Sequence, residues 1–453
     1  MQELNKWAPE ECEFYKAIYN AARQGNYDIY VVFIEKGLSL LAPDGLLGFI
    51  CPHKFWQAAY GKGIREIIAR GRLLRSVIDF GTEQIFRGAT TYTAIHVFER
   101  TRTTELVDYV HVETLVDGEA QCRALDSGGA PTGMTAFKSP HPASGDERFV
   151  FVRAGKSVRG AMEACDFLPL WKVARLAQGI KTSADDVYVL EVLGAEGAIL
   201  HVKSEHTGGV HDIEKDVTKC LVKSEHIRRF DLKDSDLVLL FPYAVAGDSY
   251  SLINVESFQR DYPSAWRYLK KVEDRLRGRE RGKMRARADW YAYIYPKNFV
   301  VLSQPKLLIP DMSDAMRVAF DQDGSRILSG GAAGGNAIIP NNKNAFEFLI
   351  GLLNSKLVEA FVRENGTQFR GGWLNCEVRF IRDVPIIQLV KTEHRRMADR
   401  IARRAAAIID LRAGLRHLRT QRQVDQAERQ VEAYENEINQ LACELYGVKE
   451  IPN

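Results

Sequence analysis

The chain has 453 residues, of which 45% are hydrophobic and 27% charged. This length predicts two or three domains, and the composition excludes a disordered, collagenous or membrane-embedded chain. Lys and Arg number 62 against 59 Asp and Glu, so the formal charge of +3 favours no class of partner.

Seven cysteines are spread widely along the chain without a CxxC pair. This pattern is typical of reduced thiols in a cytoplasmic protein and argues against a disulfide framework or a zinc site. The opening MQELNKWAPEECEFYK is polar and acidic, unlike a signal or transit peptide. Apolar runs such as residues 46–51 are far shorter than the roughly 18 residues of a membrane span. The sequence therefore predicts a cytoplasmic protein with no membrane partner and no metal.

The first segment, residues 1–115, has the pattern of part of an α/β sheet. Apolar residues at helical spacing predict a helix over 30–41, and a second helix is predicted over 63–69. Residues 46–51 (LLGFIC) form a continuous apolar run, as in a strand that is buried on both faces. Further strands are predicted over 76–80 and 93–98. A complete doubly wound domain needs several more βα units before this point.

The composition changes twice along the rest of the chain. Residues 116–148 are rich in Gly, Ser, Pro and Ala, which predicts a linker or an exposed loop. Residues 149–390 mix short strand patterns, aromatic residues and Gly or Pro breaks. This segment is predicted to be an α+β or mainly β domain.

The third segment, residues 391–453, is predicted to be a helical hairpin or coiled coil. Apolar residues recur every seven positions, first from Ile401 and then from Val424. Residues 395–422 carry nine Arg and two Asp, whereas residues 423–450 carry seven acids and two bases. The opposite charges favour pairing of the two helices, although the basic helix could also contact phosphate.

The strongest basic cluster is residues 267–287, with ten Lys or Arg against three acids. Aromatic residues flank it on both sides, at positions 262–268 and 290–295. Basic side chains attract phosphate, and aromatic side chains can stack on bases or sugars. The alternative is a solvated amphipathic helix followed by an aromatic core. The predicted DNA-binding residues in this cluster are Arg275, Arg277, Arg279, Arg281, Lys283, Arg285 and Arg287.

Three other motifs are weaker. The glycines of residues 330–335 lack the GK[ST] ending of a phosphate loop and favour a tight turn between strands. His201, His206 and His211 lie close together but have no matching cysteine or carboxylate set. Residues 366–373 (GTQFRGGW) combine a flexible backbone with Arg370, which suits either a contact with DNA or a structural turn.

The first segment resembles the later half of the adenine-specific amino-methyltransferases of restriction-modification systems. The strings YDIYVVFIEKGLSLLAPDGLLGFICPHKF and IDFGTEQIFRGATTYTAIHVFER carry this resemblance, and the fused type IIG and TaqI-like enzymes are the group most similar to it. It implies a partial Rossmann-like half-domain. It also implies S-adenosylmethionine as methyl donor and a target adenine flipped out of double-stranded DNA.

The resemblance assigns roles to four residues. Phe33, in a motif with Asp28 and Tyr30, would lie against the adenine ring of the cofactor, and Pro52 would end the central strand beside it. Phe86 would pack against the flipped base, and the spacing to Thr93 allows Tyr92 to share that role. Core packing is the alternative for all of them.

The second segment resembles the target-recognition domain of the same family. The pieces that carry this resemblance are LAQGIKTSADDVYVL, FPY, YPSAWRYLKKVEDRL, DWYAYIYPKN, IGLLNSKLVEAFV, VPII and, at the tail, INQLACELYGV. The family's Gly-rich cofactor loop, its ribose-binding acid and its Asn/Asp-Pro-Pro-aromatic tetrapeptide do not occur in this sequence. We therefore predict no catalytic residue here, and we expect a chain that begins in mid-domain and needs an N-terminal methyltransferase polypeptide.

Three functional hypotheses follow from these patterns. The first is the target-recognition half of a site-specific DNA methyltransferase (adenine-specific) of a restriction-modification or phage-defence system, inactive alone. The second is a non-catalytic DNA-binding specificity subunit of a multi-subunit complex. The third is a scaffold that uses the coiled coil.

Overall fold

The computed structural model divides the chain into two compact units. Unit 1 comprises residues 1–160, 363–373 and 452–453, and unit 2 comprises residues 161–362 and 374–451. The residues that the structure describes are 7–88, 91–100, 105–129, 131–153, 157–331, 334–366, 373–449 and 451. Within these ranges, no helix combines the length and the apolar character needed to cross a bilayer.

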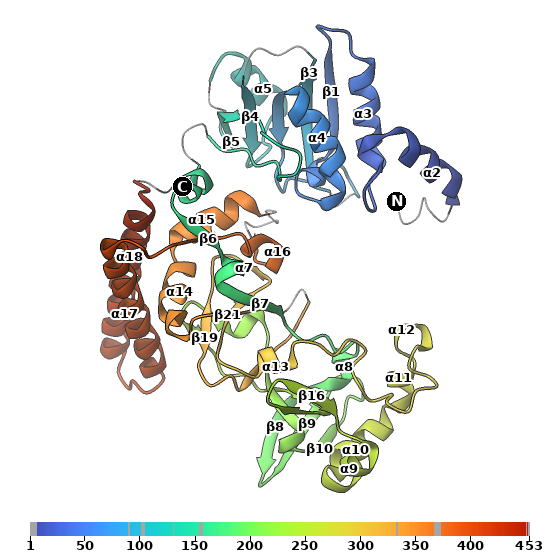
Figure 1. Cartoon of the computed structure of the whole chain (residues 1–453), viewed down its shortest axis with the longest axis vertical. Coiled ribbons are helices and arrows are strands. Elements are labelled where there is room, and N and C mark those ends of the chain that lie inside the picture. Colours follow the sequence, from blue (N-terminus) through green and yellow to red (C-terminus); the bar gives the residue numbers. More distant parts are fainter. Residues whose placement is uncertain are drawn as a thin grey trace. The chain divides into compact units, whose positions relative to one another are not determined.

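Unit 1 is built on a five-stranded mixed sheet with the strand order β1-β3-β2-β4-β5 (Figure 1). Its strands are β1 (Leu46–Pro52), β2 (Leu74–Asp79), β3 (Thr93–Glu99), β4 (Leu106–Val112) and β5 (Met134–Pro140). Its helices are α2 (Pro9–Ile18), α3 (Tyr30–Leu40), α4 (Lys62–Gly71) and α5 (Gly118–Asp126), with short η turns at 20–22, 53–56 and 59–61. β2 and β4 are parallel, and the other neighbouring pairs are antiparallel.

The predicted helices and strands of the first segment form where their patterns place them. α3 buries Val31, Ile34 and Leu38 on one side, as its helical spacing of apolar residues requires. It packs closely on β1 at Gly37, where a Cβ atom would lie 2.8 Å from Cδ2 of Leu47. The glycine therefore sets the distance between helix and strand.

Two predictions for the first 148 residues are wrong. β1 is not buried on both faces, because it lies at an edge of the sheet, and the side chains of Leu46 and Ile50 are 55% and 45% exposed. Residues 116–148 are not a linker, because they contain α5 and β5. β5 pairs with β4 from Leu106↔Pro140 to Val112↔Met134, a backbone pairing that the Gly- and Ser-rich composition conceals.

Unit 2 contains two larger sheets and four two-stranded pairs. The six-stranded sheet has the order β10-β9-β8-β14-β11-β20: β8 (Val189–Glu196), β9 (Ile199–Ser204), β10 (Val210–Glu214), β11 (Thr218–Val222), β14 (Leu237–Leu240) and β20 (Arg326–Leu328). The four-stranded sheet has the order β19-β17-β21-β7: β7 (Ala174–Gln178), β17 (Lys306–Pro310), β19 (Ala319–Asp321) and β21 (Gly335–Pro340). The pairs are β6 (Phe167–Pro169) with β23 (Pro385–Ile387), β12 (Ile227–Arg228) with β13 (Asp231–Leu232), β15 (Tyr243–Ala246) with β16 (Ser249–Leu252), and β18 (Met312–Ser313) with β22 (Leu374–Asn375).

Helices surround these sheets, so the predicted mixture of helices and strands is confirmed. They are α6 (Val158–Glu163), α7 (Leu170–Val173), α8 (Asp185–Tyr188), α9 (Val255–Asp261), α10 (Pro263–Lys271), α11 (Glu273–Arg277), α12 (Arg279–Gly282), α13 (Phe299–Leu302), α14 (Phe346–Leu353), α15 (Lys356–Asn365), α16 (Val378–Ile381), α17 (Thr392–Leu415) and α18 (Gln421–Tyr446), with η turns at 215–217, 224–226 and 343–345. The carboxylate of Glu214 caps α10, because it accepts the N–H groups of Ser264 and Ala265 at 2.8 and 2.9 Å.

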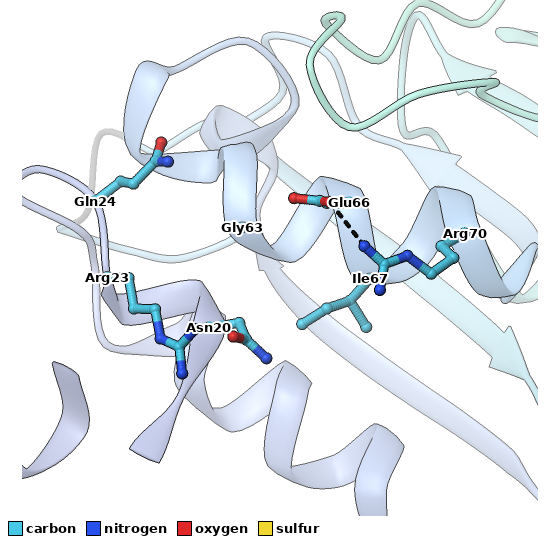
Figure 2. A pocket seen from close by; sticks show the side chains of 7 residues that line it. All are labelled: Asn20, Arg23, Gln24, Gly63, Glu66, Ile67 and Arg70. Atoms are coloured by element: carbon cyan, nitrogen blue, oxygen red, sulfur yellow. Dashed lines mark hydrogen bonds and ion pairs between the residues drawn. The ribbon is translucent and has the colours of Figure 1, made fainter. Parts of the chain in front are cut away.

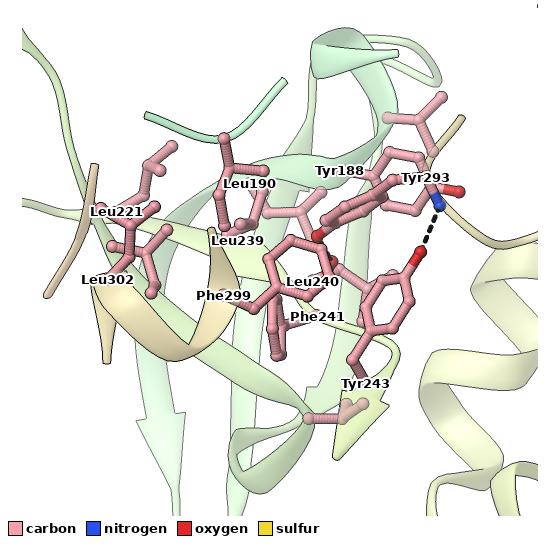
Figure 3. Close-up of a cluster of buried hydrophobic side chains, with 14 of the residues drawn as sticks. Tyr188, Leu190, Leu221, Leu239, Leu240, Phe241, Tyr243, Tyr293, Phe299 and Leu302 are labelled. Atoms are coloured by element: carbon pink, nitrogen blue, oxygen red, sulfur yellow. Dashed lines mark hydrogen bonds between the residues drawn. The ribbon is translucent and has the colours of Figure 1, made fainter. Parts of the chain in front are cut away.

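Aromatic side chains fill much of the core beside the six-stranded sheet (Figure 3). Tyr188, Tyr243, Tyr293 and Phe299 are buried there, and the N–H of Tyr293 donates a 2.7 Å hydrogen bond to the hydroxyl of Tyr243. Buried tyrosines need such partners for their polar ends. The DWYAYIYPKN string thus contributes mainly to the interior.

The two long helices of the tail, α17 and α18, run side by side in unit 2 (Figure 1). Ion pairs join the basic helix to the acidic one: Arg400 and Arg404 to Glu437, and Arg412 to Glu428. α17 also packs on α14, so the tail is part of the unit 2 core. The burial of Ile401 and Ile408 follows the predicted seven-residue repeat.

Candidate functional site

The predicted target-base residue Tyr92 and cofactor residue Pro52 lie together where β1 ends and β3 begins. Pro52 is directly opposite Thr93 in the antiparallel register. The next residue, His53, donates its backbone N–H to the carbonyl of Tyr92 at 3.1 Å. Its imidazole stacks on the rings of Trp56 and Tyr92, with centroids 4.4 and 6.2 Å away. The end of the sheet thus presents a stack of flat side chains.

A buried carboxylate supports this stack from the neighbouring strand. Asp79, the last residue of β2, accepts hydrogen bonds from the hydroxyl of Tyr109 at 2.6 Å and from the N–H of Gly81 at 2.9 Å. Nε2 of His53 and Nδ1 of His111 lie 3.5 and 3.8 Å from its oxygens. The carboxylate therefore links β2, β4 and the start of the turn after β1.

The pKa values of Asp79, His111 and His53 are shifted by these contacts and by burial. Burial alone would raise the pKa of Asp79, but the imidazoles of His111 and His53 and the hydroxyl of Tyr109 lower that pKa to about 2. The interaction with Asp79 raises the pKa of His111. Burial lowers the pKa of His53. At neutral pH, Asp79 is an anion that favours a proton on the more exposed His111.

The other two predicted residues are large aromatic side chains that the fold leaves in solvent. Phe33 on α3 is 57% exposed, and Phe86, in the turn after β2, is 45% exposed. Core packing is therefore excluded for both. Contiguous apolar patches on a surface mark contact sites, whereas a single exposed apolar side chain is common in folded proteins, so the exposure of these two rings leaves them available without assigning them a role.

The described residues around Phe33 do not fit a whole S-adenosylmethionine pocket. The carboxylates nearest to it in sequence already support the fold: Glu35 accepts the N–H of Ala21 at 2.8 Å, and Asp28 accepts the hydroxyl of Tyr60 at 3.1 Å. No free acid for a ribose is thus offered by these two side chains. To such a pocket the described residues offer the ring of Phe33 and the end of β1 at Pro52.

A shallow hollow of about 330 Å³ lies elsewhere in unit 1 (Figure 2). Its lining residues are Asn20, Arg23, Gln24, Gly63, Glu66, Ile67 and Arg70. Arg70 donates to Glu66 at 2.8 Å, so the two charges offset each other. None of the predicted site residues lines this hollow.

The basic cluster of residues 267–287 lies in unit 2, and most of its predicted DNA-binding arginines already have partners. Arg275 forms two hydrogen bonds to Asp186, at 3.0 and 2.9 Å. Arg277 bonds Glu273 at 2.7 Å, and Arg287 forms two bonds to Asp289, at 2.7 and 2.6 Å. Such pairs reduce the charge available to a phosphate.

Arg279 is buried and supports the fold. Only 2% of its surface is exposed, and its guanidinium donates to the backbone carbonyls of Leu276, Thr182, Trp290 and Ala292 at 2.7 to 3.2 Å. The prediction that Arg279 contacts DNA is wrong in this structure. Its guanidinium donates hydrogen bonds to four backbone carbonyl groups at once, as a buried planar fork of donors can.

Three cations of the cluster remain accessible around α12. In the part of the chain that the structure describes, the side chains of Arg281 and Arg285 have no hydrogen-bond or ion-pair partner. Lys283 lies 3.8 Å from Glu280 and 53% of its side chain is exposed. Arg370 falls outside the described residues.

The flanking aromatic residues are mostly unavailable for base stacking. Trp290, Tyr291 and Tyr293 are buried, as the alternative of an aromatic core predicts. Tyr295, by contrast, is 49% exposed, and the ammonium of Lys283 lies 5.1 Å from its ring centroid. No sequence pattern distinguishes Tyr295 from its buried neighbours.

Two of the weaker motifs, the glycines of residues 330–335 and the three histidines, have structural roles. The glycines of residues 330–335 connect β20 to β21, and Gly330 donates its N–H to Ile180 at 2.8 Å, as a tight turn between strands requires. The three histidines have different partners: His201 pairs with Asp212, His206 with Asp186, and His211 with Thr207.

Comparison with known proteins shows a similarity to restriction-modification methyltransferases. Residues 2–86 match the family model of the Eco57I restriction-modification methylases. The fold is similar to that of the type IIL restriction-modification enzyme MmeI solved in complex with DNA, with a TM-score of 0.61 and 14% identity over 98% of this chain and 53% of that one. The predicted relationship to restriction-modification methyltransferases is confirmed.

Among curated proteins, the chain is 23% identical over 426 residues to the type II restriction enzyme and methyltransferase RM.Eco57I of Escherichia coli. The aligned region covers 88% of this chain and 40% of that relative. The chain is 26% identical over 386 residues to the type II methyltransferase M.BstVI of Geobacillus stearothermophilus, covering 82% and 62%. The chain thus spans less than two thirds of the length of either relative.

Proposed function

We propose that this chain is the target-recognition portion of a site-specific DNA methyltransferase (adenine-specific) of a restriction-modification or phage-defence system, acting in the cytoplasm with S-adenosylmethionine as methyl donor. The similarity to type II methyltransferases supports the reaction class. The observation that carries the proposal is the exposure of Phe33 and Phe86, the aromatic residues that the resemblance assigns to cofactor and target base.

In this proposal, unit 1 is the C-terminal half of a Rossmann-like methyltransferase domain. Tyr92 and Phe86 contact the extruded base, while Phe33 and Pro52 contact the cofactor. The stack of His53 on Tyr92, with Asp79 behind it, would hold Tyr92 in place for that contact. The chain supplies these contacts to the base and the cofactor. Methyl transfer also requires the catalytic tetrapeptide, which a second polypeptide would provide.

An N-terminal methyltransferase polypeptide is the partner that we propose for unit 1. The four side chains Ile50, Ile95, Ile78 and Val110 lie in register across β1, β3, β2 and β4, on one face of the sheet. Ile50 is exposed and the other three are only partly buried. An apolar row on a sheet face, next to a free edge strand, is a surface that a partner would cover.

This partnership can be tested by co-purification with an N-terminal polypeptide that carries the catalytic tetrapeptide. Ile50→Lys should reduce the yield of the complex at least tenfold. Val210→Lys, at a residue of unit 2 that is 59% exposed, should leave the yield unchanged. Equal yields for both variants would exclude this face as the interface.

Double-stranded DNA is the proposed partner of unit 2, through Arg281, Lys283 and Arg285. Replacing all three with Ala should weaken duplex binding and reduce the slope of log K against log salt by up to about one per lost phosphate contact. A matched control replaces Lys203, Lys215 and Lys219, which are exposed lysines of the same unit, with Ala. If the control variant loses as much affinity, only net charge matters and the assignment fails.

The second candidate function is a non-catalytic DNA-binding specificity subunit. The incomplete cofactor wall around Phe33 favours it. Photocrosslinking to radiolabelled S-adenosylmethionine separates the two functions. Label on this chain only when the N-terminal polypeptide is present supports the methyltransferase, whereas no label in either case, with DNA binding retained, supports the specificity subunit.

A further inference from the structure

The turn at α12 has an unusual backbone. Glu280, Arg281 and Gly282 have consecutive positive φ angles of 46°, 62° and 84°. A non-glycine residue in this region costs roughly 1–2 kcal/mol, and two occur here in succession. The four carbonyl bonds of the buried Arg279, which precedes them, anchor the base of the turn.

This backbone places the carboxylate of Glu280 among cations and a phenol. Its Oε2 accepts a 2.8 Å hydrogen bond from the hydroxyl of Tyr295 and lies 3.8 Å from Nζ of Lys283. The same ammonium lies over the Tyr295 ring. One anionic oxygen is therefore held by a hydroxyl and an ammonium, two of the donor types that bind phosphate oxygens of DNA.

Further cations stand near Glu280 in the chain. Arg281 follows it directly, and the guanidinium of Arg285 lies over the turn, with its carbon 3.6 Å from where a Cβ of Gly282 would be. Neither side chain has a hydrogen-bond or ion-pair partner in the described ranges. One carboxylate among three cations is the arrangement expected if an internal anion occupies an anion-binding position. The Glu280 carboxylate balances only one of these positive charges, so the turn keeps a net positive charge.

We propose that the carboxylate of Glu280 occupies, in the DNA-free protein, the position of a backbone phosphate, and that duplex DNA displaces it. Tyr295 and Lys283 then bind the phosphate oxygen. This inference rests on the proposed DNA binding of unit 2. It makes Glu280 a competitor of the ligand, so removal of its charge should strengthen DNA binding, which is the opposite of the usual effect of altering an interface residue.

The experiment measures binding of a fluorescent duplex to the full chain across a salt series. Glu280→Gln keeps an oxygen that can accept from Tyr295 but removes the charge, and it should bind about fivefold more tightly at low salt. Glu280→Lys should bind more tightly still. Tyr295→Phe and Lys283→Met, which remove the donors, should bind more weakly than the wild-type chain.

Glu256→Gln is the matched control, because it removes one exposed acid from α9 of the same unit. It should change affinity by less than twofold. If Glu280→Gln binds like the wild type or like this control, the competitor role is overturned while DNA binding stands. If the wild-type chain shows no salt-dependent affinity for duplex DNA, the proposed function itself fails.

Folding of the Glu280 variants is checked by circular dichroism and thermal unfolding. If Glu280→Gln does not fold, Glu280→Ala takes its place with the same expectation. Weaker binding by a folded Glu280→Ala variant would contradict the inference, because it would show that the carboxylate helps the complex.

Discussion

The hydroxyl of Tyr109 on β4 donates a 2.6 Å hydrogen bond to Oδ2 of Asp79 on the adjacent parallel strand β2. Three further polar groups surround the same carboxylate: the N–H of Gly81 and the imidazoles of His53 and His111. A carboxylate with so many partners stabilises the fold only while it is ionised.

Asp79→Asn should therefore lower stability in a pH-dependent way. The folded pKa of Asp79 is about 2, below its ordinary value of 3.8, so its contribution is present above pH 4 and is lost as the pH falls toward 2. We expect the variant to be less stable by about 2 kcal/mol at pH 7 and nearly equal to the wild type at pH 2. Urea unfolding from pH 2 to 7 measures this difference, and a constant difference would contradict it.

The same substitution should change the titration of His111. Its pKa is raised by Asp79, so its contribution to stability is complete below pH 6.5 and is lost as the pH rises through the folded pKa. In Asp79→Asn, the NMR titration of His111 should move down toward 6.5. His211 of unit 2, whose pKa is lowered by burial, serves as the internal control, and its titration should be the same in the variant.

Lys306 and Asp321 form a fully buried ion pair between β17 and β19 in unit 2. Lys306→Met would leave the buried Asp321 carboxylate without its nearest cation, and the guanidinium of Arg326, 3.9 Å away, would be its remaining charged neighbour. The expected cost is about 3–5 kcal/mol in the free energy of unfolding. The double variant Lys306→Met/Asp321→Leu should recover much of this loss. A double variant as unstable as the single one would show that the pair itself, and not the uncompensated charge, accounts for the cost.

Gly351 on α14 and Gly414 on α17 make a matched pair of glycine-to-alanine changes. A Cβ at Gly351 would lie 2.6 Å from Cγ2 of Ile401, so Gly351→Ala should separate the two helices and cost about 1–3 kcal/mol. A Cβ at Gly414 meets no described atom within 4 Å, and Gly414→Ala should stabilise the helix by up to about 1 kcal/mol. Thermal unfolding of both variants should give shifts of opposite sign.

Phe33 and Phe86 are exposed, whereas Phe55 and Phe98 are buried, so their replacement should affect stability differently. Phe33→Ala and Phe86→Ala should change stability by less than about 0.5 kcal/mol. Phe55→Ala and Phe98→Ala, at fully buried positions of the same unit, should cost about 3–5 kcal/mol. Denaturant unfolding distinguishes the two groups, and a large loss for Phe86→Ala would show that its ring supports the fold.

With stability intact, Phe86→Ala becomes an informative functional variant. In the reconstituted enzyme it should spare DNA binding and reduce base extrusion, which 2-aminopurine fluorescence at the target position reports. Lost DNA binding together with lost fluorescence would mean that Phe86 does not act on the base alone.

Local patterns in the amino-acid sequence were sufficient to place α3, α4, β2 and β3, because the apolar residues of each have the spacing of a helix or a strand. The strings around Phe33 and Phe86 also sufficed to indicate the resemblance to restriction-modification methyltransferases. The sequence could not show that β5 joins the sheet or that β1 lies at its edge, since strand pairing depends on residues distant in the chain.

Tertiary structure alone separated the members of the basic cluster. Arg279 and Arg281 belong to the same run of basic residues, but Arg279 is buried against four carbonyls, whereas the Arg281 side chain has no partner among the described residues. The left-handed backbone at Glu280 and Arg281 separates the two environments. The Asp79 cluster likewise draws its members from separate strands, so no sequence motif records it. The spacing of apolar residues specifies each helix and strand. Which charges pair and which side chains are buried depends on which helices and strands pack together in the folded chain.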